Sequence, residues 1–170
     1  MGSRNFSKMS NLYEFKEELH QNISLDSAIA ELYPEESFFD LMSGVLNESG
    51  IVDNMEYKPF RDTRKGIKID GYSWNELERV FCGVIVHLSD DPEDVASISK
   101  TDIENLGKRV SRYLEQASSR KFRDSLDVSS IGRSTGDFLA NVKDEILKYR
   151  VLVITDSVIS DRVKKINIEP

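Results

Sequence analysis

GIKIDGY at residues 66–72 and VFCGVIVHL at residues 80–88 are the two segments that set the architecture of this 170-residue chain. The first alternates apolar and polar side chains, which is typical of a strand with one buried face, and the second is apolar on both faces. A short polar break around Asn75-Glu76 separates them. We therefore predict a β-hairpin whose second strand is buried on both faces.

Asp70 stands beside the buried strand, where a carboxylate is costly unless it is paired, hydrogen-bonded or bound to a metal. With the turn in the polar break, Asp70 lies across from about Gly83 or Val84. Two interpretations stay open at this point. Asp70 belongs to a metal-linked functional site, or it bonds nearby backbone N–H groups and fixes a turn or bulge.

The overall composition is that of a globular domain, with 39% hydrophobic and 31% charged residues. A chain of this length buries a sizeable single core. No apolar run approaches the roughly 20 residues that cross a bilayer, and no secretory signal is visible, so we expect no membrane partner. The one cysteine, Cys82, lies within the apolar strand and predicts a buried thiol in a reducing, cytoplasmic location.

Apolar spacing on either side of the hairpin predicts further helices and strands. The predicted helices are 11–22, 24–32, 34–50, from a cap at 99 or 101 to 118, 137–147 and 158–165; the predicted strands are 54–60, 67–74, 79–88 and 149–156. Leu12, Phe15 and Leu19 mark the inward face of the first helix. We expect residues 1–10 to be a tag or a disordered N-terminus, and residues 129–136, which contain GRSTG, to be a connecting loop.

This order predicts an α/β (α+β) domain with a mixed sheet, in which the hairpin strands are antiparallel and a helical crossover leads to a final parallel strand. Extra helices precede the core at the N-terminus. The order resembles the three-layer core of the restriction-endonuclease-like fold, whose nucleases carry the PD-(D/E)XK signature. We expect residues 11–170 to form one nuclease-like domain. The abrupt ending at residues 166–170 indicates the N-terminal fragment of a longer protein.

Several segments add a second resemblance. They are ESFFDL at 36–41 leading to ESG at 48–50, KIDGY at 68–72 with the strand after it, and YRVLVITDSVISDRVKK at 149–165. Together they resemble the N-terminal domain of the abortive-infection phage-resistance (AIPR) family over residues 34–168. The resemblance implies a part in phage resistance by abortive infection. It also implies a partner, the larger C-terminal region of the full-length protein.

The nuclease resemblance implies a metal site built from a helix carboxylate, the hairpin aspartate and a (D/E)-x-K pair on the next strand. Such oxygen ligands bind Mg²⁺ or Mn²⁺, which activate water and neutralise charge on the leaving oxygen. We predict Asp70 and Asp40 as catalytic residues and, with Glu36 one turn before Asp40, as metal ligands. An exposed helix face is the alternative for Asp40 and Glu36. The strand positions opposite Asp70 supply neither a carboxylate nor a lysine, which argues against ordinary activity.

Six basic residues gather in the second half of a chain whose net charge is −7. They are Lys108, Arg109, Arg112, Arg120, Lys121 and Arg123. A basic strip on an acidic protein predicts contact with a nucleic-acid backbone, and an ordinary solvated helix face is the alternative. Association into a homo-oligomer also stays open.

The remaining polar candidates are few. His20, His87 and Cys82 are too far apart in sequence for a zinc pattern, and we expect His20 to be exposed at a helix edge. Residues 155–157 follow the parallel strand, at the edge where α/β sheets bind ligands, or they cap a helix. Two functions stay open: a nuclease-fold domain of a phage-resistance protein, and a non-catalytic protein-interaction or sensing module of the same defence protein.

Overall fold

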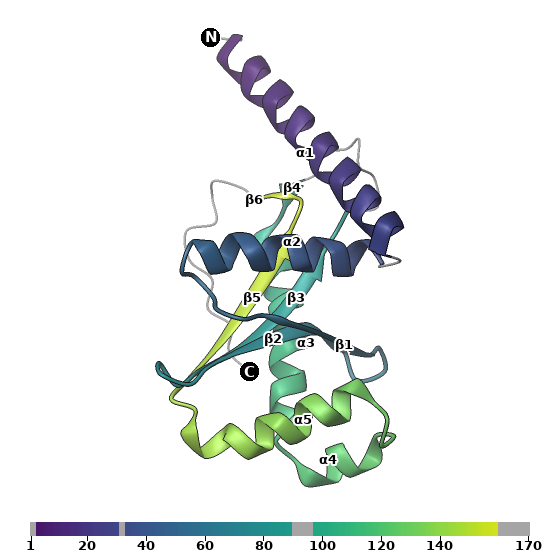
Figure 1. Cartoon of the computed structure of the whole chain (residues 1–170), viewed down its shortest axis with the longest axis vertical. Helices are drawn as coiled ribbons and strands as arrows, with labels where there is room; N and C mark the ends of the chain where they lie inside the picture. The colour runs from purple at the N-terminus through teal and green to yellow at the C-terminus, as the bar shows by residue number, and fades with distance from the viewer. Residues whose placement is uncertain (1–2, 31–32, 90–96, 160–170) are drawn as a thin grey trace.

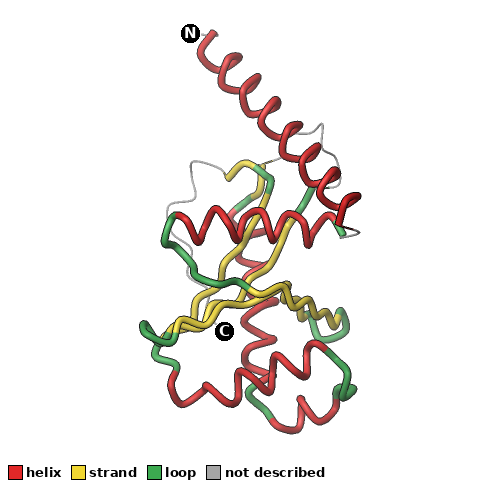
Figure 2. Tube along the Cα trace, viewed as in Figure 1, coloured by secondary structure: helices red, strands yellow, loops and turns green. Residues whose placement is uncertain are grey.

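The computed structural model describes residues 3–30, 33–89 and 97–159, and a four-stranded sheet in the order β1-β2-β3-β5 lies at its centre (Figures 1 and 2). The strands are β1 Glu56–Asp62, β2 Ile67–Asn75, β3 Val80–His87 and β5 Lys148–Thr155, with a second sheet of β4 Ser97–Ile98 and β6 Val158–Ile159. The helices are α1 Ser3–Ala30, α2 Pro34–Glu48, α3 Lys100–Ala117, α4 Arg120–Ser125 and α5 Ile131–Val142, followed by a 3-10 turn at Lys143–Glu145.

The sheet is mixed. β1 and β3 each pair antiparallel with β2, and β5 pairs parallel with β3 after the crossover through α3, α4 and α5. Helices cover both faces, with α2 on one side and the crossover helices on the other (Figure 1). The predicted α/β (α+β) class, with its hairpin, its helical crossover and its extra N-terminal helix, is confirmed.

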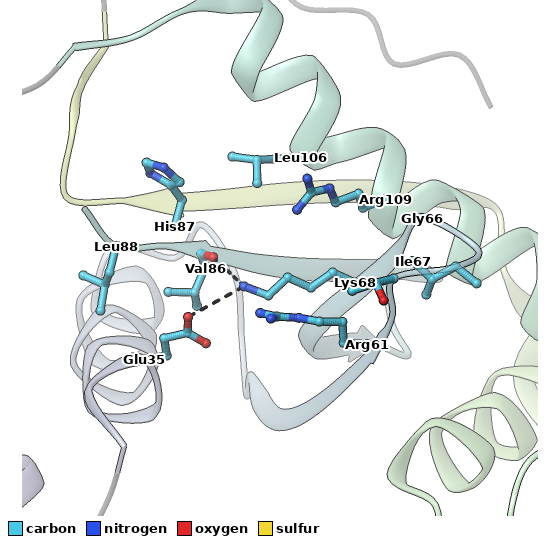
Figure 3. A pocket seen from close by; sticks show the side chains of 11 residues that line it. Glu35, Arg61, Gly66, Ile67, Lys68, Val86, His87, Leu88, Leu106 and Arg109 are labelled. Atoms are coloured by element: carbon cyan, nitrogen blue, oxygen red, sulfur yellow. Dashed lines mark hydrogen bonds and ion pairs between the residues drawn. The ribbon is translucent and has the colours of Figure 1, made fainter. Parts of the chain in front are cut away.

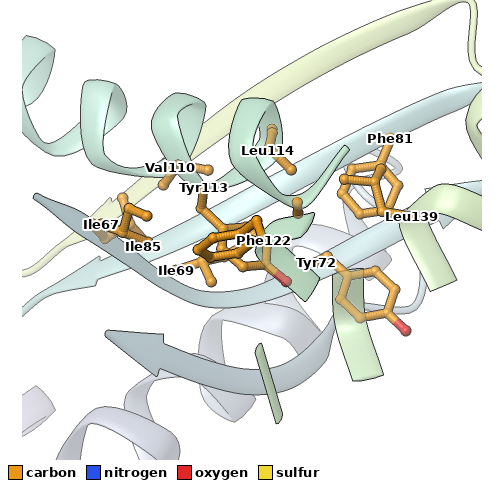
Figure 4. Close-up of a cluster of buried hydrophobic side chains, with 11 residues drawn as sticks. Ile67, Ile69, Tyr72, Phe81, Ile85, Val110, Tyr113, Leu114, Phe122 and Leu139 are labelled. Atoms are coloured by element: carbon orange, nitrogen blue, oxygen red, sulfur yellow. The ribbon is translucent and has the colours of Figure 1, made fainter. Parts of the chain in front are cut away.

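Two hydrophobic cores flank the sheet, which explains why the sequence of β3 is apolar on both faces. Alternate residues of β3 serve different cores. Phe81 and Ile85 belong to the core that Val110 and Tyr113 of α3 cover; in Figure 4 Ile85 lies near Val110, and Phe81 lies near Leu139. The opposite core, under α2, contains Ile23, Phe38, Phe39, Cys82, Val84, Val86 and Ile154.

Cys82 is buried within the core under α2, with 4% of its surface exposed. Burial raises the pKa of its thiol to about 11, although the positive charge of Arg150 opposes the shift. Since thiolate is the reactive form, we expect the native protein to resist iodoacetamide at pH 8 and to be labelled only as it unfolds. Mass spectrometry with and without guanidinium measures this. Rapid labelling of the native chain would contradict the burial.

The N-terminal helix differs from the prediction. α1 is one continuous helix that starts at Ser3, because no glycine or proline interrupts residues 3–30, and the cap signal at residue 24 does not break it. Among residues 11–24 of this helix, Lys16 and Ile23 are buried, whereas Phe15 is 64% exposed, so the predicted inward face is wrong at that position. α1 packs on α2 and its first half extends away from the sheet (Figure 1). No described helix has the length and apolar character needed to span a membrane.

The GRSTG segment is helical, not a loop, because α5 begins at Ile131. The glycines of this segment permit neighbouring side chains to pack closely against the helix, and they do not mark a flexible loop. A Cβ at Gly132 would overlap the ring of Phe60 in β1, and one at Gly136 would lie 3.2 Å from the side chain of Arg123. The helix therefore approaches the sheet more closely than larger residues allow.

The C-terminal elements are partly as predicted. β5 is parallel, but it lies at the edge of the described sheet and is only half-buried, with Tyr149 46% exposed. Residues 158–159 form β6 instead of a helix, pairing with β4. The rest of the predicted helix 158–165 and residues 166–170 lie outside the described residues.

Candidate functional site

The β2–β3 pairing is not continuous along both strands. It runs from Asn75 opposite Val80 to Gly71 opposite Val84, which is a one-residue shift from the predicted register. Beyond that point residues 67–69 of β2 pair with β1, and residues 85–87 of β3 pair with β5. The two central strands therefore part beside Asp70.

Two side chains of β2 replace the missing backbone pairing. The Val86 N–H donates to Asp70 Oδ2 at 2.7 Å, and Lys68 Nζ donates to the Val86 carbonyl at 3.1 Å. Asp70 thus bonds a backbone N–H, as one interpretation predicted, but on the neighbouring strand and not within its own turn. We call this arrangement the Lys68–Asp70 wedge, because its side chains fill the gap between the strands.

The wedge is charged and buried. Asp70 is 2% and Lys68 8% exposed, and Lys68 Nζ lies 3.3 Å from Asp70 Oδ2. Burial raises the pKa of Asp70, and Glu35 adds to the rise, although the Val86 N–H and Lys68 oppose it. Glu35, in the first turn of α2, reaches the same ammonium at 3.9 Å. One lysine therefore joins two carboxylates from different elements.

A cleft of about 340 Å³ lies where the strands part (Figure 3). It is lined by Glu35, Arg61, Thr63, Gly66, Ile67, Lys68, Val86, His87, Leu88, Leu106 and Arg109. A second cleft of about 540 Å³ adjoins it, because His87 and Arg109 line both. The cleft wall carries three permanent cations against one carboxylate, which suits an anionic ligand.

The other predicted ligands lie nearby on α2. Asp40 is exposed, and partial burial raises the pKa of its carboxyl, while Glu36 is half-buried. Burial also raises the pKa of Tyr57, and the charges of Asp70, Glu35, Glu36 and Asp40 raise it further. These carboxylates therefore share one electrostatic environment. Within the described residues, however, no three Asp, Glu, His or Cys side chains gather closely enough to hold a metal ion.

The sequence interpretation missed two members of this site, Lys68 and Glu35. The nuclease signature places its lysine on the strand after the aspartate, which is β3 here, and β3 carries no lysine and no carboxylate. The lysine comes from β2 itself, two residues before Asp70. A signal was present: Ile67 and Ile69 point into one core, so Lys68 and Asp70 share the opposite face. Glu35 had no comparable signal, because its place depends on how α2 packs.

A second buried carboxylate lies at the end of β5. Asp156 accepts hydrogen bonds from His20 Nε2 at 2.7 Å, the Ser89 N–H at 2.9 Å and Ser89 Oγ at 2.8 Å. Lys16 Nζ lies 3.9 Å away. The expectation that His20 is exposed is wrong, because this contact leaves only 18% of its side chain exposed. Asp156 ties α1 to the sheet, which makes it structural.

The six predicted basic residues divide into two sets. Arg120 pairs with Asp124 at 3.5 Å, and Arg123 pairs with Asp137 at 3.1 Å. Lys108, Arg109, Arg112 and Lys121 are exposed. Arg109 lines the cleft, so part of the predicted strip adjoins the candidate site.

These features define an α/β domain with a charged cleft where two central strands part. Residues 38–169 match the family model described as the abortive infection phage resistance protein N-terminal domain. The match spans more than three quarters of the chain, which belongs to this family. No curated protein and no solved structure matches the chain. The AIPR resemblance is confirmed, and the PD-(D/E)XK resemblance stays a prediction.

Proposed function

We propose that this domain binds a nucleic-acid phosphodiester in the cleft and hydrolyses it with Mg²⁺ or Mn²⁺. The observation that carries the proposal is the buried Asp70 carboxylate, which lies behind Lys68 at a cleft lined by Arg61 and Arg109. A buried acid with a raised pKa beside a specific charge partner is typical of functional sites.

The carboxylates of the site suit a metal ion that is bound partly by the protein and partly by the phosphate of the substrate. Lys68 Nζ lies 3.3 Å from Asp70 and 3.9 Å from Glu35, so both carboxylates face the same positive charge. Mg²⁺ is commonly held by one or two carboxylates and completes its shell with water and substrate phosphate. Asp70 and Glu35 would therefore hold the ion, and Asp40 and Glu36 are further candidates through the environment they share. The ion would supply an activated water and neutralise charge on the leaving oxygen.

The other residues of the cleft have separate roles in this proposal. Arg61 and Arg109 bind phosphate oxygens, for which the guanidinium fork is well suited. With a cation held by the carboxylates, the ammonium of Lys68 would be free to bind the phosphate. The Val86 N–H fixes the orientation of the Asp70 carboxylate. The lysine that the signature places on the next strand is thus supplied by β2.

The test is calorimetric titration of Mn²⁺ into the chain and into its Asp70→Asn and Glu35→Gln variants. We expect saturable binding that Asp70→Asn abolishes and Glu35→Gln weakens. Asp124→Asn is the matched control, because that carboxylate is exposed on α4 and should leave binding unchanged. An oligonucleotide cleavage assay in Mn²⁺ gives the second readout, with activity lost in Asp70→Asn.

Asp70→Asn keeps an oxygen that accepts the Val86 N–H, so we expect a folded variant; the fluorescence of the single tryptophan, Trp74, checks this. Absence of Mn²⁺ binding at millimolar concentration, or equal binding by a folded Asp70→Asn, would overturn the proposal. The domain would then act as a non-catalytic interaction or sensing module.

A further inference from the structure

The turn between β1 and β2 lies against α3 and α4. Gly66 in this turn has φ +64°, and an added Cβ would lie 2.7 Å from Arg112 Nη1 of α3. Lys65 Nζ lies 4.8 Å from the ring centroid of Phe122 in α4, a cation–π contact. Lys65, Lys121 and Phe122 also line one shallow pocket. Basic residues distant in sequence therefore meet along one seam.

This seam starts at the candidate site. Arg61 and Arg109 line the cleft together with Gly66, and Gly66 contacts Arg112. We call Arg61, Lys65, Arg109, Arg112 and Lys121 the hairpin–α3 strip. Figure 3 shows its two residues at the cleft, where Arg61 extends from β1 and Arg109 from α3.

The charges of the strip are available for a ligand. Within the described residues Arg61, Arg109 and Arg112 form no ion pair, in contrast with Arg120 and Arg123. The nearest acidic side chain of the turn, Asp62, accepts hydrogen bonds from the backbone N–H groups of residues 64 and 65. Its role is to hold the turn and not to neutralise the arginines.

The strip is longer than one phosphate group. Gln116, which lines the pocket with Lys65 and Lys121, lies seven positions after Arg109, and this corresponds to about 10 Å along a helix axis. A row of cations of this length contacts successive phosphates of a polymer. A free phosphate or a mononucleotide would occupy only one end.

We infer that the hairpin–α3 strip binds successive phosphates of a single polynucleotide strand and leads that strand into the cleft. This inference rests on the proposed function, because it supplies the path by which the substrate reaches Asp70. The hairpin–α3 strip differs from the strip predicted from the sequence: it leaves out Lys108, Arg120 and Arg123, and it adds Arg61 and Lys65 from β1 and its turn.

The test measures binding of a fluorescent 20-nucleotide single strand, as DNA and as RNA, by anisotropy in EDTA. The triple variant Arg61→Gln, Arg109→Gln, Arg112→Gln is compared with a charge-matched control, Arg120→Gln, Lys143→Gln, Lys148→Gln, whose three residues are also exposed. We expect the first triple to lose at least about tenfold in affinity at 50 mM salt. The slope of log affinity against log salt should fall by about 2. The control should change neither quantity by more than about twofold.

Equal losses in the two triples would show that only net charge matters, and would overturn the inference. So would the absence of oligonucleotide binding at low salt, or equal binding of polyglutamate, which carries acidic charge without phosphates. The anisotropy experiment is done in EDTA and so does not depend on a metal ion. If the chain fails to bind Mn²⁺ but only the first triple variant loses affinity for the oligonucleotide, then hydrolysis is refuted and binding by the strip is supported. Trp74 fluorescence and Cys82 protection confirm that each variant is folded.

Discussion

Alanine at Gly71 is expected to destabilise the domain by about 3 kcal/mol, near the upper end of typical overpacking effects. The added Cβ would overlap the backbone carbonyl oxygen of Glu56 in β1 and lie 2.5 Å from the Phe39 ring. Phe39 is fully buried and Glu56 is fixed by strand pairing, so neither can move aside cheaply. Denaturant unfolding followed by Trp74 fluorescence measures the loss.

Gly44→Ala is the matched control for this change. Gly44 lies within α2, and an added Cβ there meets nothing within 4 Å. Since alanine favours helix over glycine, we expect Gly44→Ala to stabilise the domain by up to about 1 kcal/mol. A loss below about 1 kcal/mol in Gly71→Ala would mean that β1 and α2 yield more readily than the packing indicates. A glycine at position 71 would then not be required for packing.

Asp156→Ala is expected to cost about 3 kcal/mol, the lower end of the range for removing one partner of a buried charge pair. The Asp156 side chain is fully buried, and its removal takes away a charge near Lys16 and an acceptor of the Ser89 N–H. The link from α1 to β5 through His20 is lost as well. Asp124→Ala removes an exposed carboxylate from a surface pair and should cost no more than about 0.5 kcal/mol.

The same carboxylate makes the stability dependent on pH. Burial alone would raise the pKa of Asp156, but hydrogen bonds from His20 and Ser89 and the charge of Lys16 outweigh it, so the pKa is lowered. A lowered pKa in the folded state contributes stability above the unfolded value of about 3.9, which is lost as the pH falls through the folded pKa. Unfolding curves between pH 7 and 3 should show this loss in the wild type and a smaller one in Asp156→Asn. Parallel pH profiles would contradict the assignment.

Local signals were sufficient for much of the fold. Ser99 and Asp102 form the capping box that starts α3, and Pro34 starts α2, both close to the predicted positions. The alternation of β2 and the continuous apolar run of β3 identified the hairpin. These signals act within a few residues of chain, so a single sequence is enough to detect them.

The features that the sequence did not predict depend on packing between segments that are distant in the chain. The glycines of GRSTG resemble loop residues in the sequence, but in the structure Gly132 packs against Phe60 and Gly136 against Arg123. The contact between His20 and Asp156 joins residues 136 positions apart. In the candidate site Asp70 was predictable because burying a carboxylate is costly, whereas Glu35 depends on the position of α2. The shift in register arose because the turn lies at residues 76–79, beyond the predicted break at residues 75 and 76, and the turn sets the register of a hairpin.

The Lys68–Asp70 wedge has a consequence for communication across the sheet. Elsewhere β2 and β3 are joined by backbone hydrogen bonds, whereas at Val86 the junction consists of two charged side chains of β2. A ligand that drew Lys68 away from the Val86 carbonyl would remove one of the two contacts that join the strands at this point. Under the proposed function, binding in the cleft would therefore weaken the sheet beside the site.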